Sequence, residues 1–112
     1  MEKRTSGKVL EISDKFKANF DHIHDYTLET FGYAQAEHYV KKIEKAVASL
    51  SRWHLLYPEC RHIPTKSQMY RNIVLDAHLI IYRITKQRIE VLDIVHSASS
   101  VSKIRGARKI CI

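Results

Sequence analysis

Proline, glycine and cysteine are all scarce in this chain, with two, three and two residues among 112. So little glycine and proline excludes a collagen-like or low-complexity protein. Cys60 and Cys111 fit neither a disulfide framework nor the paired spacing of a zinc site, so we expect a reducing cytoplasm. No apolar run approaches the ~20 residues that span a bilayer, and no signal-peptide pattern opens the chain. We therefore expect no membrane association.

The remaining composition is that of an ordinary globular protein, with 45% hydrophobic and 28% charged residues. Its length predicts a single domain, 1–112, with one modest core. The formal net charge of +7 indicates an acidic partner, which is nucleic acid, an acidic protein or both. No glycine-rich phosphate loop, G-x-S-x-G motif or paired-carboxylate site is present, and we expect no cofactor.

Two helices are predicted in the first half of the chain. The first follows Ser13 and Asp14, which are good N-cap types, and has apolar-face residues at helical spacing: Phe16, Phe20, Ile23, Thr27 and Phe31. Gly32 stands where a C-terminal cap belongs. The second keeps the same period for about six turns, through Ala36, Tyr39, Val40, Ile43, Ala46, Val47, Leu50 and Trp53. The short connection predicts an antiparallel helical hairpin.

Three β-type runs follow between Met69 and His96, separated by the pairs Asp76-Ala77 and Lys86-Gln87. Two-residue polar turns between such runs predict an antiparallel meander. Residues 8–13 alternate and predict a first strand, and residues 101–112 predict a short basic helix. The predicted fold class is α+β: an N-terminal strand, a helical hairpin, a three-stranded meander completing one sheet, and a basic C-terminal segment.

Two-residue turns also fix which side chains share a face of the sheet. The more apolar face, which we expect under the hairpin, holds Arg71, Ile73, Leu75, Ile80, Tyr82, Ile84, Ile89, Val91 and Val95. The opposite face holds Tyr70, Asn72, Val74, Leu79, Ile81, Arg83, Arg88, Glu90, Leu92, Ile94 and His96. This register places Arg83 and His96 together. A one-residue bulge would alter the assignment.

The roles of Arg83 and His96 have two interpretations. Arg83 could hold a phosphate or carboxylate while His96 moves a proton, or Arg83 could simply pair with Glu90 across the strands. Arg71 is either an edge residue or an anion ligand. Metal binding is not expected, because His22-x-His24 does not place both rings on one helix face and Cys60-Arg61-His62 lacks a second ligand pair.

The chain resembles the RelE/ParE superfamily of bacterial toxins from type II toxin–antitoxin systems. The resemblance rests on the order and spacing of several short motifs: Phe31-Gly32-x-Ala34-x-Ala36, the segment from Leu50 to Pro58, Tyr70-Arg71, Tyr82-Arg83-Ile84 and Val91-Leu92-x-Ile94-x-His96-Ser97-Ala98. It implies a growth-inhibitory toxin that an acidic antitoxin neutralises in a hetero-oligomer.

Two targets are known in this superfamily. RelE-like members cut messenger RNA on the ribosome, which here would require a rearranged site of Lys66, Arg71, Arg83 and His96. However, Leu79 stands where that branch has an Arg, and no Tyr follows His96. The ending Leu-x-Ile-x-His-Ser-Ala looks more like ParE-type plasmid-stabilisation proteins, some of which poison DNA gyrase. Ser99 departs from that pattern too, because an Arg usually stands there.

The resemblance therefore favours a toxin that binds gyrase and is not itself an enzyme. The candidate target-binding residues are Tyr70, Arg71, Arg83, His96, Lys103 and Arg105. A ribosome-dependent ribonuclease and a non-toxic binding module that keeps only the fold remain as alternatives.

Overall fold

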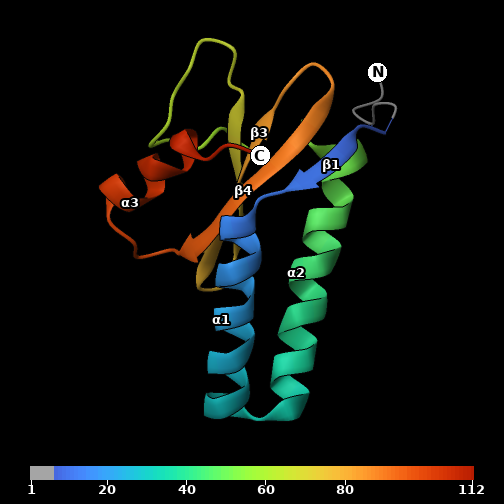
Figure 1. The fold of residues 1–112 in the computed structure, drawn as a ribbon, viewed down its shortest axis with the longest axis vertical. Coiled ribbons are helices and arrows are strands. Elements are labelled where there is room, and N and C mark those ends of the chain that lie inside the picture. Colours follow the sequence, from blue (N-terminus) through green and yellow to red (C-terminus); the bar gives the residue numbers. More distant parts are fainter. Residues whose placement is uncertain (1–6) are drawn as a thin grey trace.

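A computed structural model describes residues 7–112, so most of the predicted polar tail lies outside the described residues. A four-stranded sheet carries a long helical hairpin on one face and a short helical segment on the other (Figure 1). In chain order the elements are β1 (Val9–Ile12), α1 (Asp14–Phe31), α2 (Tyr33–Trp53), β2 (Tyr70–Leu75), β3 (His78–Ile84), β4 (Arg88–His96), α3 (Val101–Arg105) and the 3-10 helix η1 (Gly106–Lys109).

The predicted meander is confirmed. The strand order is β1-β4-β3-β2, with β2, β3 and β4 antiparallel and β1 added in parallel against β4. Leu75 pairs with His78 across the first turn. At the second turn Thr85 N–H donates to Arg88 O at 2.9 Å. The first turn therefore has the predicted two-residue length. At the second turn Thr85 faces Arg88 as predicted, but three residues, 85–87, lie between β3 and β4.

The helical hairpin begins and turns where expected. The Ser13 hydroxyl accepts a hydrogen bond from Phe16 N–H at 2.9 Å and caps α1, as a serine N-cap does. Gly32 ends α1 with a φ of 91°, a backbone conformation that residues other than glycine rarely adopt. Its N–H donates to Leu28 O and its carbonyl accepts from Ala36 N–H. One residue thus closes the first helix and opens the second.

Each face of the sheet has its own core. The core under the hairpin consists of Phe16, Ile43, Val47, Leu50, Ile73, Ile80, Tyr82, Ile89, Val91 and Ile94. The core under the C-terminal helices consists of Cys60, Ile63, Ile81, Leu92, Val95, Ile104 and Ala107. Burying apolar area on both faces is how so small a chain stabilises a sheet.

A bulge in β4 corrects the predicted faces. Ile81 pairs with Asp93 but the next residue, Tyr82, pairs with Val91, so Leu92 is the extra residue. Ser13 holds the bulge, because its N–H donates to Val91 O at 3.0 Å and its hydroxyl donates to Leu92 O.

Beyond the bulge the side chains of β4 change sides. The prediction that Val95 lies under the hairpin is wrong, since Val95 packs in the opposite core. The prediction that Ile94 and His96 lie on the opposite face is wrong as well. Ile94 belongs to the hairpin core, and His96 lines a groove beneath the hairpin. Asp93 stabilises the bulge, because its Oδ1 accepts hydrogen bonds from Asn19 Nδ2 at 2.6 Å and from Ile94 N–H at 2.8 Å.

Candidate functional site

Arg83 is tied into the sheet face that the C-terminal segment covers. Its Nε donates to Glu90 Oε1 at 2.6 Å, which confirms the predicted cross-strand pair. Its Nη1 donates to the Tyr70 hydroxyl at 3.3 Å, and the guanidinium lies 5.7 Å from the centre of the Tyr70 ring. The Arg83 side chain is 14% exposed, so most of its charge is already paired within the protein.

Glu90 is shared between two arginines. Arg88 Nε donates to Glu90 Oε2 at 2.8 Å, so each carboxylate oxygen faces a guanidinium. Burial would raise the pKa of Glu90, but hydrogen bonds and charge from Arg83 and Arg88 outweigh it and lower that pKa. Burial would likewise lower the pKa of Arg83, but its bonds to Tyr70 and Glu90 outweigh this and raise it.

The same arginines hold the C-terminal tail. Arg83 donates from Nη1 to Arg108 O at 3.4 Å and from Nη2 to Ile110 O at 3.1 Å. Arg88 Nη2 reaches Ile112 O at 3.4 Å. Arg83 thus acts first as a support for the tail, and little of its donor capacity remains for an external anion.

Arg71 is also occupied by main-chain carbonyls. Its Nε donates to Gln68 O at 3.1 Å, and its Nη1 donates to Leu55 O at 3.2 Å and Tyr57 O at 2.9 Å. These bonds fasten the loop between α2 and β2 against the edge strand. The main chain of Glu59, in the same loop, also pairs with that of Arg71 as an isolated antiparallel β-bridge.

The other cationic candidates face solvent. Lys66 lies exposed in the loop before β2, and Lys103 and Arg105 lie exposed on α3. The short helix α3 is fixed by Ile104, which is buried in the core beneath it. The structure therefore presents Lys103 and Arg105 on an ordered surface beside the tail that Arg83 holds.

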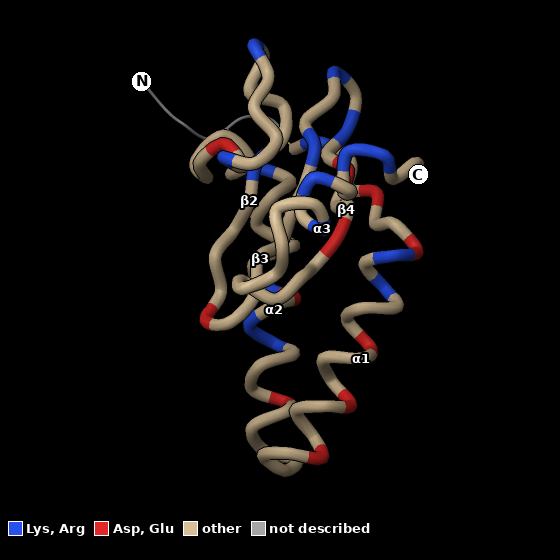
Figure 2. The backbone as a smooth tube through the Cα atoms, turned by 90° about the vertical axis from the view of Figure 1, so that its left-hand side faces the viewer, with Lys and Arg blue, Asp and Glu red and all other residues tan. Residues whose placement is uncertain are grey.

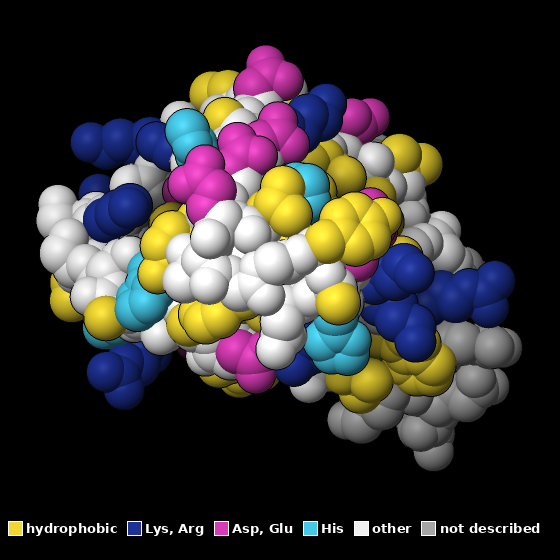
Figure 3. Space-filling view, turned by 90° about the horizontal axis from the view of Figure 1, so that it is seen from below, with side chains coloured by type: hydrophobic (Ala, Val, Ile, Leu, Met, Phe, Trp, Pro, Cys, Tyr) yellow, Lys and Arg dark blue, Asp and Glu magenta, His cyan; other side chains and the backbone are white. Residues whose placement is uncertain are grey.

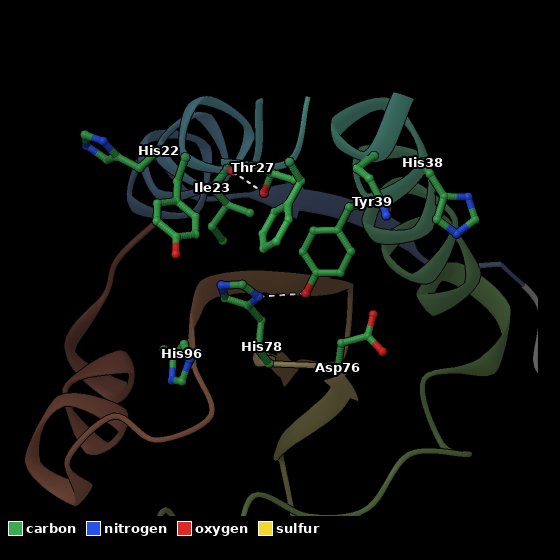
Figure 4. Close-up of a pocket in the computed structure, with 12 residues that line it drawn as sticks. His22, Ile23, Thr27, His38, Tyr39, Asp76, His78 and His96 are labelled. Atoms are coloured by element: carbon green, nitrogen blue, oxygen red, sulfur yellow. Dashed lines mark hydrogen bonds between the residues drawn. The ribbon is translucent and has the colours of Figure 1, made fainter. Parts of the chain in front are cut away.

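His96 occupies a different part of the molecule from Arg83. It faces His78 on β3, with ring centroids 5.7 Å apart, in a groove of about 620 Å³ between the sheet end and the hairpin (Figure 4). The Tyr39 hydroxyl lies 2.6 Å from His78 Nδ1. Burial lowers the pKa of His78, and the neighbouring His96 lowers it further.

The predicted residues fall into separate groups. Tyr70 and Arg83 lie together, and the segment carrying Lys103 and Arg105 covers the same face. Arg71 pairs with Tyr82, whereas His96 pairs with His78 at the other end of β3. Tyr82 and His78 are four residue steps apart along the extended strand, which is about 13 Å. Lys66, Arg71, Arg83 and His96 therefore do not converge on one point.

The sequence reading missed the histidine groove. His78 follows directly after the Asp76-Ala77 turn, so a correct register for β4 would have placed it opposite His96. The signal was the polar Asp93 within an otherwise apolar run, because its carboxylate stabilises the bulge. Within residues 7–112 no group of three or more His, Cys, Asp or Glu side chains is arranged to hold a metal ion.

The four-stranded sheet and the helical hairpin on one of its faces define a small α+β domain. The family model described as the ParE toxin of the type II toxin–antitoxin system parDE matches residues 10–101. This match covers most of the chain, which therefore belongs to the ParE toxin family and is the toxin component of such a system.

A solved structure supports the fold. The chain is similar to a protein in the chromosomal ParDE TA system from P. aeruginosa, with a TM-score of 0.66 and 20% identity over 82% of this chain and 98% of that one. No curated protein matches the sequence. In the part of the chain that the structure describes, no helix has the length and apolarity to cross a membrane.

Proposed function

We propose that this ParE-family toxin inhibits growth by binding DNA gyrase, without itself catalysing a reaction, and that a cognate acidic antitoxin neutralises it. The observation that carries the proposal is the dispersal of the ribonuclease candidates. A ribonuclease needs a proton-transferring group and cations around one phosphate. Here Arg71 and Arg83 are engaged by main-chain carbonyls and Glu90, and His96 lies on the opposite face from Arg83.

The proposed target surface is the basic C-terminal face. Its candidate residues are Tyr70, Arg83, Lys103 and Arg105, with Arg71 and His96 as the more distant candidates. Lys103 and Arg105 are free to meet an acidic surface, whereas Arg83 maintains the tail that lies beside them. Long-range attraction between this face and an acidic partner would speed their encounter.

Purified toxin should inhibit the supercoiling activity of gyrase or trap it on cleaved DNA. The Lys103→Ala/Arg105→Ala variant tests the basic face, since both side chains are exposed and their removal leaves the fold intact. Lys15→Ala/Lys17→Ala is a matched control with two exposed lysines on α1. We expect the first variant to lose at least tenfold in potency and the control to lose less than twofold.

The same assay separates the alternatives. No effect on gyrase at large molar excess, with new 5′ ends in messenger RNA after induction, would replace the proposal with a ribosome-dependent ribonuclease. Undiminished colony formation during strong expression of soluble protein would leave a binding module that keeps only the fold. The known association of this family with antitoxins predicts that co-expressing the adjacent antitoxin gene restores growth.

The antitoxin should be an acidic protein that forms a hetero-oligomer with the toxin. The complementary surface is the exposed cationic end of the chain, formed by Lys103, Arg105, Arg108 and Lys109. Because these are surface charges, the complex should weaken as ionic strength rises. Titration of the complex at increasing salt, followed by size-exclusion chromatography, measures that dependence.

A further inference from the structure

The tip half of the helical hairpin has the opposite charge to the rest of the chain. Residues 18–40 include four acidic residues and no Lys or Arg, so the remaining sequence holds all 19 Lys and Arg against eight Asp and Glu. Figure 2 shows the acidic positions along the lower hairpin and the basic ones toward the sheet. A protein with a net charge of +7 therefore has one clearly acidic end.

A groove opens at this acidic end, where the hairpin runs past the sheet. Its volume is about 620 Å³, and among the described residues its lining includes no Lys or Arg. Aromatic side chains form its outer wall, with Tyr26 65% exposed and Phe31 61% exposed. Seen from the hairpin end, hydrophobic, acidic and histidine side chains gather on one surface (Figure 3). Exposed aromatic rings beside a groove are typical of an interaction site.

The floor of the groove offers one hydrogen-bond donor beside one acceptor. Ala98 N–H donates to His96 Nδ1 at 3.0 Å, so the neutral His96 ring carries its proton on Nε2. With the single Tyr39 hydroxyl proton assigned to Leu75 O, 3.2 Å away, the His78 tautomer that satisfies the 2.6 Å contact donates from Nδ1, and its Nε2 is then an acceptor. Within residues 7–112 neither Nε2 atom has a hydrogen-bond partner.

We propose that this groove docks a basic amphipathic segment of a partner protein, with an apolar side chain against Tyr26 and Phe31 and an amide group on the His78–His96 pair. An amide presents a donor and an acceptor side by side, which matches the two rings. The acidic hairpin end selects the basic flanks of the segment by charge. This surface is separate from the cationic face proposed for the acidic antitoxin.

The chemistry of the groove favours a protein segment over nucleic acid. A nucleic acid ligand needs cations to meet its phosphates, and the groove lining offers none among the described residues. Asp76 at the rim already holds Lys42 in an ion pair of 2.9 Å, which leaves that lysine neutralised. The aromatic wall and polar floor instead suit an anchor residue followed by main-chain contacts.

The test uses two fluorescein-labelled 14-residue helical peptides, one of leucine and lysine and one of leucine and glutamate in the same pattern. Fluorescence anisotropy with the full-length toxin gives their dissociation constants, and toxicity is not involved. The lysine peptide should bind the native chain, and Tyr26→Ser/Phe31→Ser should weaken it by tenfold or more. Val74→Ser is the matched control, because Val74 is 64% exposed on β2 and lies outside the groove.

A second variant probes the floor without altering the wall. His96→Phe removes the donor at an exposed position, and it should weaken the lysine peptide about threefold or more while leaving the glutamate peptide unchanged. Equal binding of both peptides, or equal affinity in Tyr26→Ser/Phe31→Ser and the native chain, would overturn the proposal. So would sedimentation showing a dimer that Tyr26→Ser/Phe31→Ser dissociates, since a second copy would then be the occupant.

Discussion

Arg83 and Glu90 face each other across β3 and β4, with Nη2 2.6 Å from Oε1 and both side chains largely buried. The pair connects the sheet to the C-terminal tail, because Arg83 also donates to Ile110 O. Loss of toxicity on replacing Arg83 therefore has two possible origins, a lost target contact or a loosened tail. Stability must be measured beside activity for every variant at this position.

Arg83→Ala should lower the free energy of unfolding by about 2–3 kcal/mol, because it leaves a buried carboxylate with only one arginine. The remaining bond from Arg88 keeps the loss below that of a fully orphaned charge. Chemical denaturation followed by circular dichroism measures the change. Lys103→Ala, at an exposed position, should change the free energy by less than about 0.5 kcal/mol. Equal stability of Arg83→Ala and the native chain would show that the pair contributes nothing.

Glu90 should make the protein sensitive to acid. Its pKa is lower in the folded chain than in the unfolded one, so its stabilising contribution is full above the ordinary glutamate pKa and is lost as the pH falls through the lowered value. Each tenfold difference in proton affinity between the folded and unfolded chain corresponds to about 1.4 kcal/mol of stability. Denaturation curves from pH 6 to pH 3 should fall less steeply for Glu90→Gln than for the native chain. Parallel curves would contradict this.

His78 should make the stability depend on pH in a higher range than Glu90 does. Burial and the charge of His96 lower its pKa, so the folded state resists protonation where the unfolded state accepts a proton. Stability should therefore fall as the pH drops through about 6.5 toward the lowered folded pKa, and then level off. His78→Gln should fall less over this range. Burial also lowers the pKa of His54, but His54 is present in both proteins, so the difference isolates His78.

Ser13→Ala should cost about 1–2 kcal/mol of stability, near the upper end for a helix cap. The hydroxyl both accepts from Phe16 N–H and donates to Leu92 O, so its loss removes the cap and one support of the bulge. Ser100→Ala is the control, because Ser100 caps the short, exposed α3 through Lys103 N–H. Thermal unfolding of the two variants should show the larger fall for Ser13→Ala. Equal falls would mean that the bond to Leu92 has no added effect.

Local patterns were enough to predict most of the fold. The caps at Ser13 and Gly32, the helical spacing between them and the short turns of the meander all involve neighbours in sequence. Such features depend on residues a few positions apart, and short windows record them. The parallel pairing of β1 with β4 joins residues about 80 positions apart, and no local pattern specifies it.

The candidate site was harder to predict from the sequence, because one extra residue, Leu92, determines which side chains of β4 share a face. Up to Val91 the alternation of β4 holds, but the bulge at Leu92 moves every later side chain to the other face. His96 consequently joins His78, and its predicted partnership with Arg83 disappears. The bulge is supported by Asn19 and Ser13, which precede it in the sequence by 74 and 79 residues. No pattern around these two residues predicts that contact.

The position of β1 sets the order in which this toxin can be completed during synthesis. β1 is the first strand to leave the ribosome, yet its pairing partner β4 is the last. The hairpin can form early, but the sheet that joins both ends of the chain cannot close until residues 88–96 have emerged. Until β4 joins the sheet, Arg83 and Arg88 are not positioned to hold the C-terminal tail, so the cationic face is among the last parts of the domain to form.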